Sequence, residues 1–196
     1  MRARLLSLAA STLVTSVILG SEPWAQEGLG CPAGTYGIVL TSDGGTLTVL
    51  FDAFLVEAGG SPDARIDHKI CRLHIPLQLP PDTSVGVYKV DYRGYASLAH
   101  RQQFELTVVY GFNSNRDHNF RRQIRGQHDD DFTFSQTIGA GLMRRVGCGE
   151  DAALDVEATI ALNTNGQPGQ ALAAFDSLDG VPKGGLIYHF DYSRCR

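Results

Sequence analysis

Apolar side chains recur at every second position along much of this chain, and this period of two constrains the fold most. Between residues 104 and 110 the apolar positions are Phe104, Leu106, Val108 and Tyr110. An α-helix would repeat its apolar face every 3.6 residues, whereas successive side chains of a β-strand point to opposite sides of a sheet. We therefore expect half-buried strands here and in four similar stretches, at residues 47–51, 73–79, 154–162 and 186–192.

Turn-forming residues separate these stretches. Asp-Gly-Gly occupies residues 43–45, Pro-Pro-Asp residues 80–82 and Asn-Thr-Asn-Gly residues 163–166. Such residues supply the positive or preset φ angles that chain reversals need. No long amphipathic helical run follows the first 25 residues. The pattern predicts an all-β fold, either an antiparallel β-sandwich or a related open barrel.

The N-terminus has the organisation of an export signal. Arg2 and Arg4 precede a region of small and apolar residues at 5–20, which serines and threonines interrupt. This region falls short of the uninterrupted apolar run of about 20 residues that a transmembrane helix needs. We expect a signal peptide at residues 1–25, cleaved after Ala25, and one domain at residues 26–196. The predicted location is secreted, extracellular or periplasmic, with no transmembrane anchor after cleavage.

Four cysteines follow the predicted signal peptide, and no two are close in sequence. Their even number in an exported chain predicts disulfides, and the absence of close pairs disfavours a zinc site. Four cysteines allow three connectivities. We favour Cys31 with Cys71 and Cys148 with Cys195, because the members of each pair lie in the same half of the chain.

Composition and motifs exclude several functions. The formal net charge of −4 does not suit nucleic-acid binding. The sequence contains no Gly-x-Ser-x-Gly, no His-Glu-x-x-His, no phosphate-binding glycine loop and no nucleotide-binding glycine fingerprint. These absences favour a protein that is not an enzyme, although catalytic groups can also assemble from distant positions.

One candidate binding site is Asp-Tyr-Arg-Gly-Tyr at residues 91–95. On a regular strand Asp91, Arg93 and Tyr95 share one face, where they would suit a sugar ring and its hydroxyls, and Tyr92 lies on the other face. The structural alternative is an ion pair between Asp91 and Arg93 with the tyrosines in the core.

A second candidate is the polar segment at residues 111–131, which breaks the alternation. It contains Arg121, Arg122 and Arg125, candidates for binding a polar or anionic partner. We expect a long surface loop or a hairpin extension here. Next to His128, Asp129 and Asp131 share one face of an extended segment and are the candidate ligands for calcium, the one cofactor considered. A solvated acidic turn is the alternative.

The order of motifs resembles a family of secreted fungal and bacterial proteins, domain of unknown function 4360. The motifs are Gly-Cys-Pro-Ala-Gly-Thr at 30–35, Thr-Leu-Thr-Val-Leu-Phe-Asp at 46–52, Lys-Ile-Cys at 69–71, Val-Asp-Tyr-Arg-Gly-Tyr-Ala at 90–96, Cys-Gly at 148–149 and a cysteine near the C-terminus. The resemblance covers nearly the whole chain after the signal and implies one secreted domain. It implies no activity, cofactor or catalytic residue, and the segment 116–131 departs from the serine- and threonine-rich stretch of fungal members.

Two functions remain open. The first is a non-catalytic module of the cell exterior that binds a glycan, a surface component or another protein. The alternative is an extracellular hydrolase that uses carboxylates or a histidine, such as Asp129 or Asp131 with His128.

Overall fold

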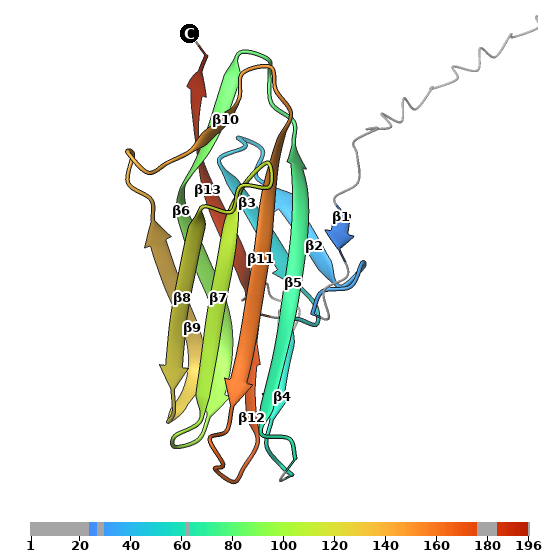
Figure 1. Ribbon diagram of the computed structural model, residues 1–196, viewed down its shortest axis with the longest axis vertical. Helices are drawn as coiled ribbons and strands as arrows, with labels where there is room; N and C mark the ends of the chain where they lie inside the picture. Colours follow the sequence, from blue (N-terminus) through green and yellow to red (C-terminus); the bar gives the residue numbers. More distant parts are fainter. Residues whose placement is uncertain (1–23, 27–29, 62, 176–183, 196) are drawn as a thin grey trace, which may run out of the picture.

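The chain forms two antiparallel β-sheets stacked face to face (Figure 1). The computed structural model describes residues 24–26, 30–61, 63–175 and 184–195. The predicted signal peptide lies outside the described residues except for Trp24 and Ala25. These two residues belong to a short strand, so a cut after Ala25 would remove most of that strand, and the cleavage site stays a prediction.

Sheet A has five strands with β11 at its centre. Their order is β1 (Trp24–Gln26), β5 (Ile66–Leu77), β11 (Ala152–Asn163), β7 (Gln103–Phe112) and β8 (His118–Arg125). Strand β11 pairs with β5 on one side and with β7 on the other. The period-two residues predicted the strands β5, β7 and β11 correctly.

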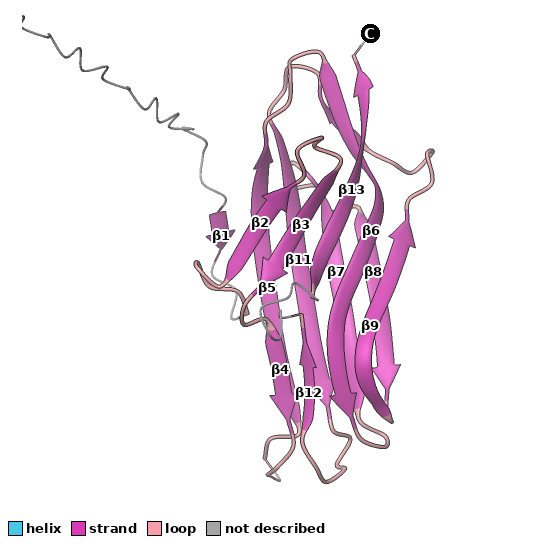
Figure 2. Ribbon diagram, turned by 180° about the vertical axis from the view of Figure 1, so that it is seen from behind, coloured by secondary structure: helices cyan, strands magenta, loops and turns pink. Residues whose placement is uncertain are grey.

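Sheet B is organised around β6 (Thr83–Leu98), which faces the viewer in Figure 2. One edge of β6 pairs with β13 (Gly185–Arg194) and β12 (Ala171–Ala174), and its other edge pairs with β9 (His128–Thr137) and β10 (Arg145–Gly147). Strand β13 continues to β3 (Thr46–Phe51) and then β2 (Tyr36–Leu40), while β12 continues to β4 (Leu55–Ala58).

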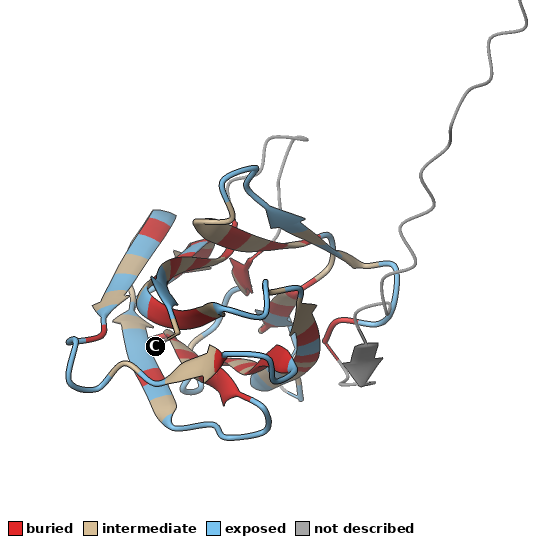
Figure 3. Cartoon of the chain, turned by 90° about the horizontal axis from the view of Figure 1, so that it is seen from above, coloured by how far each residue is buried: buried red, intermediate tan, exposed pale blue. Residues whose placement is uncertain are grey.

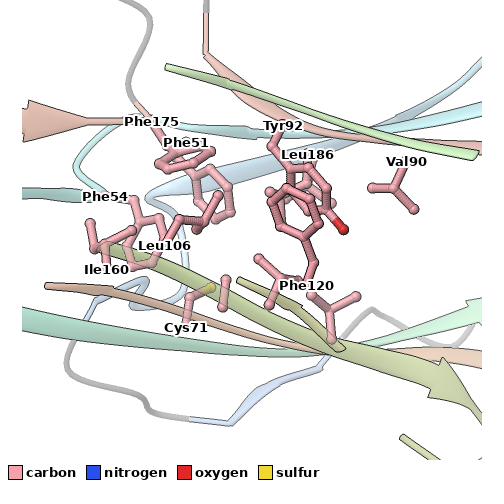
Figure 4. Close-up of a cluster of buried hydrophobic side chains, with 14 of the residues drawn as sticks. Phe51, Phe54, Cys71, Val90, Tyr92, Leu106, Phe120, Ile160, Phe175 and Leu186 are labelled. Atoms are coloured by element: carbon pink, nitrogen blue, oxygen red, sulfur yellow. The ribbon is translucent and has the colours of Figure 1, made fainter. Parts of the chain in front are cut away.

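Side chains from the inner faces of both sheets fill the core. Leu106 and Ile160 of sheet A and Tyr92 and Leu186 of sheet B are completely buried (Figure 4). A view along the long axis shows buried segments facing the space between the sheets (Figure 3). These contacts confirm the predicted all-β sandwich. The stretch predicted at residues 186–192 departs from the alternation at its last position, because Tyr192 is 38% exposed near the end of β13.

Gly94 explains why the motif at residues 90–96 needs a glycine. A Cβ atom at this position would lie 2.5 Å from the carbonyl oxygen of Ala174 and 2.6 Å from Cζ of Phe132. Both distances are far inside van der Waals contact. The glycine therefore lets β12 and the Phe132 ring pack against the middle of β6.

Two disulfides fasten the two ends of the chain to the sandwich. Cys31 is bonded to Cys71, and Cys148 is bonded to Cys195. Both pairings confirm the prediction from sequence.

The polar segment at residues 111–131 is not a long loop. Most of it forms strand β8 and the start of β9, joined by a turn at Gly126 and Gln127, and the two strands belong to different sheets. Of the two alternatives, the long loop was wrong, and the hairpin extension was right only in that two strands follow each other across a tight turn, since β8 pairs with β7 and β9 with β6. Both strands lie at sheet edges, where polar side chains replace the alternation. Only Phe120 of β8 is fully buried.

Candidate functional site

The outer face of sheet B gathers polar side chains from three strands. Period-two alternation turns Lys89, Asp91 and Arg93 of β6 outward, away from the buried Val90 and Tyr92. In the sheet register Asp91 lies opposite Ser135 of β9 and Ile187 of β13. The register therefore brings together residues that are far apart in sequence.

Asp91 is the centre of this group. Its carboxylate accepts hydrogen bonds from Lys89 Nζ at 2.9 Å and from the Ser135 hydroxyl, and its Oδ2 lies 2.8 Å from His189 Nε2. The residue is only 4% exposed. Burial alone would raise the pKa of Asp91, but the hydrogen bonds from Ser135, Lys89 and His189 outweigh it and lower the pKa to about 2. The carboxylate is thus ionised and fixed in place.

A β-bulge adds an aromatic ring beside this carboxylate. His189 pairs with Lys89 and Phe190 pairs with Val87, so the intervening Tyr88 has no partner in β13. The Tyr88 side chain is 42% exposed, and its ring centroid lies 5.9 Å from that of His189. The bulge therefore presents a tyrosine next to the Asp91 group.

Arg93 and Tyr95 continue the same face. Arg93 is exposed, and no hydrogen bond or ion pair joins its side chain to another part of the chain that the structure describes. The ion pair between Arg93 and Asp91, the structural alternative, is therefore not formed, and Lys89 pairs with Asp91 instead. The Tyr95 hydroxyl donates to Asp129, which raises the pKa of Tyr95 and lowers that of Asp129.

We call this surface the Asp91 face and define it by five residues: Tyr88, Lys89, Asp91, Arg93 and His189. Sequence analysis identified Asp91 and Arg93 and missed the other three. The outward position of His189 follows from the buried alternation of Leu186, Tyr188 and Phe190, which was a usable signal. No pattern in the sequence indicated the bulge that exposes Tyr88.

The three candidate arginines lie elsewhere, on β8 at the edge of sheet A. Arg121 forms an ion pair with Glu105 at 2.7 Å, and Arg122 lies over the Phe120 ring at 4.8 Å. Arg125 donates to Gln123 at 3.4 Å. The structure therefore places them on a different part of the surface from the Asp91 face.

The candidate calcium ligands do not form a cluster. Asp129 and Asp131 share the outer face of β9, as expected, but Asp129 is engaged by Tyr95. Among the described residues, no three His, Cys, Asp or Glu side chains are grouped to hold a metal ion. His128 points to the opposite side of β9 from Asp129, and its buried Nε2 has no hydrogen-bond partner within the described chain.

A cavity lies at the end of the sandwich beside Gly149. It has a volume of about 800 Å³, and its lining includes His74, Asn113, Glu150 and Asp151. His74 Nδ1 lies 2.8 Å from Oδ1 of the buried Asp155, whose other oxygen accepts the Ser114 backbone N–H at 2.7 Å. Among the described residues that line this cavity there is no serine, threonine or cysteine.

Two packed antiparallel sheets, two disulfides and a polar outer face define a disulfide-stabilised β-sandwich protein. The model of one family, domain of unknown function (DUF4360), matches residues 23–195, and the chain belongs to this family. An uncharacterized secreted protein of Arthroderma benhamiae is 26% identical over 169 residues, covering 86% of this chain and 68% of the relative. The protein is accordingly secreted, in agreement with its two disulfides.

One solved structure is similar over 89% of each chain at 11% identity, that of TmCBM61 in complex with beta-1,4-galactotriose. Its TM-score of 0.29 is too low to support an inference about this protein. Within the described ranges, no helix is long and apolar enough to cross a membrane.

Proposed function

We propose that the protein is a non-catalytic binding module of the cell exterior, and that the Asp91 face binds a glycan. The observation that carries this proposal is the buried Asp91 carboxylate, which holds Lys89 and His189 in place beside an exposed tyrosine. Sugar rings offer hydroxyls that need donors and acceptors at fixed positions, and C–H surfaces that pack on aromatic rings. The Asp91 face supplies oriented polar groups for the hydroxyls and an exposed aromatic ring for the C–H surface.

The hydrogen bonds of Asp91 reduce the entropy that binding would cost. Lys89 has four flexible methylene groups, and ordering such a side chain on a ligand costs about 0.5–1.5 kcal/mol. Its Nζ atom is already fixed on Asp91, and so is the His189 ring. A hydroxyl that reached this surface would meet groups that are already oriented. Asp91 itself is a positioning residue, because it is too buried to contact a ligand broadly.

Arg93 has the properties of a ligand-contacting residue. Its guanidinium is exposed and lacks a partner among the described residues, while the arginines of sheet A mostly have one. A planar group with five donors suits two neighbouring hydroxyls or a carboxylate of a sugar. We assign it the strongest polar contact of the face.

The ionisation of the carboxylates favours binding over glycoside hydrolysis. A hydrolase needs a general acid, a carboxyl group whose pKa is raised so that it holds a proton near neutral pH. The pKa of Asp91 is lowered to about 2, and the pKa of Asp129 is also lowered. Lowered pKa values favour the ionised form of both carboxyl groups, which does not suit the role of a general acid.

The test is binding of the purified secreted protein to a panel of soluble oligosaccharides and insoluble polysaccharides, followed by calorimetry on any that bind. Tyr88→Ala and Arg93→Ala should each raise the Kd by roughly tenfold, through the lost ring contact and the lost charged hydrogen bonds.

The matched controls are Tyr192→Ala and Arg101→Ala, which remove an exposed tyrosine and an exposed arginine outside the face. They should leave the Kd unchanged. Absence of binding to every glycan, or equal binding by the Tyr88 and control variants, would refute the proposal.

A further inference from the structure

The flank of the sandwich at β8 and β9 has two unpaired sheet edges side by side (Figure 1). Among the described strands, β8 pairs only with β7 and β9 pairs only with β6. The open edges are 8 and 10 residues long. Open edges expose backbone N–H and C=O groups that can pair with another strand.

The two edges carry opposite charges. We define the β8–β9 flank by Arg121, Arg122 and Arg125 of β8 together with Asp129, Asp130 and Asp131 of β9. No ion pair within the described chain joins the arginines of one strand to the aspartates of the other. The strands belong to different sheets, whose backbones stack about 10 Å apart, so the two sets face outward separately.

Charges on an edge strand often serve only to prevent aggregation. That role is best met by one sign of charge, since two copies of such a flank repel each other. The β8–β9 flank instead has a basic edge next to an acidic edge. A surface of this kind is complementary to itself and suits a second copy of the same chain.

The position of the charges along the strands fits such pairing. The turn at Gly126 and Gln127 joins the strands, so residues equally distant from it lie at the same height. Arg122 lies three residues before the end of β8, and Asp131 lies three residues after the start of β9. The basic and acidic groups therefore occupy the same level of the flank.

We infer that two copies of the chain associate through this flank around a two-fold axis parallel to the strands. A rotation about such an axis leaves the position of each residue along the strand direction unchanged. It places β8 of one copy beside β9 of its partner. Because β8 and β9 run in opposite directions (Figure 1), the new neighbours are antiparallel. Both interfaces then join arginines to aspartates, and sheet A of each copy continues into sheet B of the other.

Individual side chains remain available for these contacts. Arg122 lies over the Phe120 ring and donates one hydrogen bond to the Arg121 carbonyl at 2.9 Å, and the residue is exposed. Asp130 and Asp131 are exposed, and the hydrogen bond from the Asp131 backbone N–H to Asp130 Oδ1 engages one of four carboxylate oxygens. The contacts can form without breaking an ion pair described within the chain.

Sedimentation equilibrium of the purified secreted protein at low and high salt tests the inference. We expect a dimer at low salt that dissociates as salt screens the exposed charges. Arg122→Glu with Arg125→Glu makes the flank mainly acidic, with only Arg121 left as a cation, and Asp130→Lys with Asp131→Lys makes it mainly basic, with only Asp129 left as an anion. Each double variant alone should be monomeric, with a dimer Kd raised on the order of a hundredfold by like-charge repulsion.

An equimolar mixture of the two double variants is the decisive sample. It should form a heterodimer, because each acidic edge again meets a basic one. Arg194→Glu, which reverses an exposed arginine at the end of β13, should dimerise like the unaltered protein. Thermal melting checks that every variant is folded. A monomer at about 100 μM in low salt, or a mixture that stays monomeric, would overturn the inference.

Discussion

The outer faces of the two sheets use charge differently. On sheet A, Arg72 and Arg116 both contact Glu157 at 2.8 Å, and Arg121 contacts Glu105 at 2.7 Å. Each of these cations meets an anion on a neighbouring strand or loop. On sheet B Arg145 likewise pairs with Asp191, but the Asp91 carboxylate lies beneath several donors and the Arg93 side chain has no partner among the described residues.

This difference separates charges that hold strands together from charges that are kept for a ligand. Cross-strand pairs on an exposed sheet face contribute modestly and compensate each other locally. A buried carboxylate that orients several donors has a larger effect on stability and leaves those donors facing solvent. The contrast therefore predicts different responses to mutation on the two faces.

The largest difference is expected between the two carboxylates. Asp91→Ala removes the common acceptor of the half-buried Lys89 and His189 and of the exposed Ser135, and should lower the free energy of unfolding by about 2–3 kcal/mol. Glu157→Ala, on the exposed face of sheet A, should lower it by under about 1 kcal/mol. Urea unfolding followed by fluorescence measures both. Equal losses would remove the distinction between the faces.

The second difference is in the response to acid. The pKa of Asp91 is lowered from 3.8 to about 2, so its contribution to stability is present above pH 4 and is lost as the pH falls toward 2. The contribution is on the order of 2 kcal/mol. The difference in unfolding free energy between the unaltered protein and Asp91→Asn should therefore shrink between pH 5 and pH 2. A difference that is constant with pH would show that the Asp91 carboxylate does not gain these hydrogen bonds on folding.

The smallest effect is expected on β8. Replacing Arg121, Arg122 and Arg125 together by Ser should lower the free energy of unfolding by about 1 kcal/mol or less, because exposed pairs contribute little. Leu106→Ala, beneath the same sheet, should cost about 2–5 kcal/mol through lost burial and a cavity. Melting of dilute samples, in which self-association is negligible, compares the two. Equal destabilisation would make the arginines part of the folded scaffold.

The alternation of apolar residues was enough to predict the main strands and the core. Leu106, Tyr110, Val156 and Ile160 lie where period two places them, since each strand has one face in the core and one in solvent. Strands β8 and β9 could not be predicted this way. They lie at sheet edges and have polar side chains on most positions, so the sequence there resembles a loop.

The Asp91 face could be predicted only in part. Asp91 and Arg93 share one strand, so their common orientation follows from local geometry. Ser135 and His189 reach Asp91 through pairing of β6 with β9 and β13, and the register of those pairs is set by contacts across the whole sheet. No pattern within a single strand specifies that register.

The distance along the chain between Asp91 and His189 has a consequence for folding. These hydrogen-bonded residues are 98 positions apart, and Asp91 and Ser135 are 44 apart. One disulfide joins Cys31 to Cys71 and the other joins Cys148 to Cys195. Strand β6 lies between these two loops, so neither disulfide links it to β13. Folds dominated by such long-range pairing form slowly, in about milliseconds to seconds. A chain that has closed both covalent loops but has not yet docked its C-terminal strand therefore carries no assembled Asp91 face.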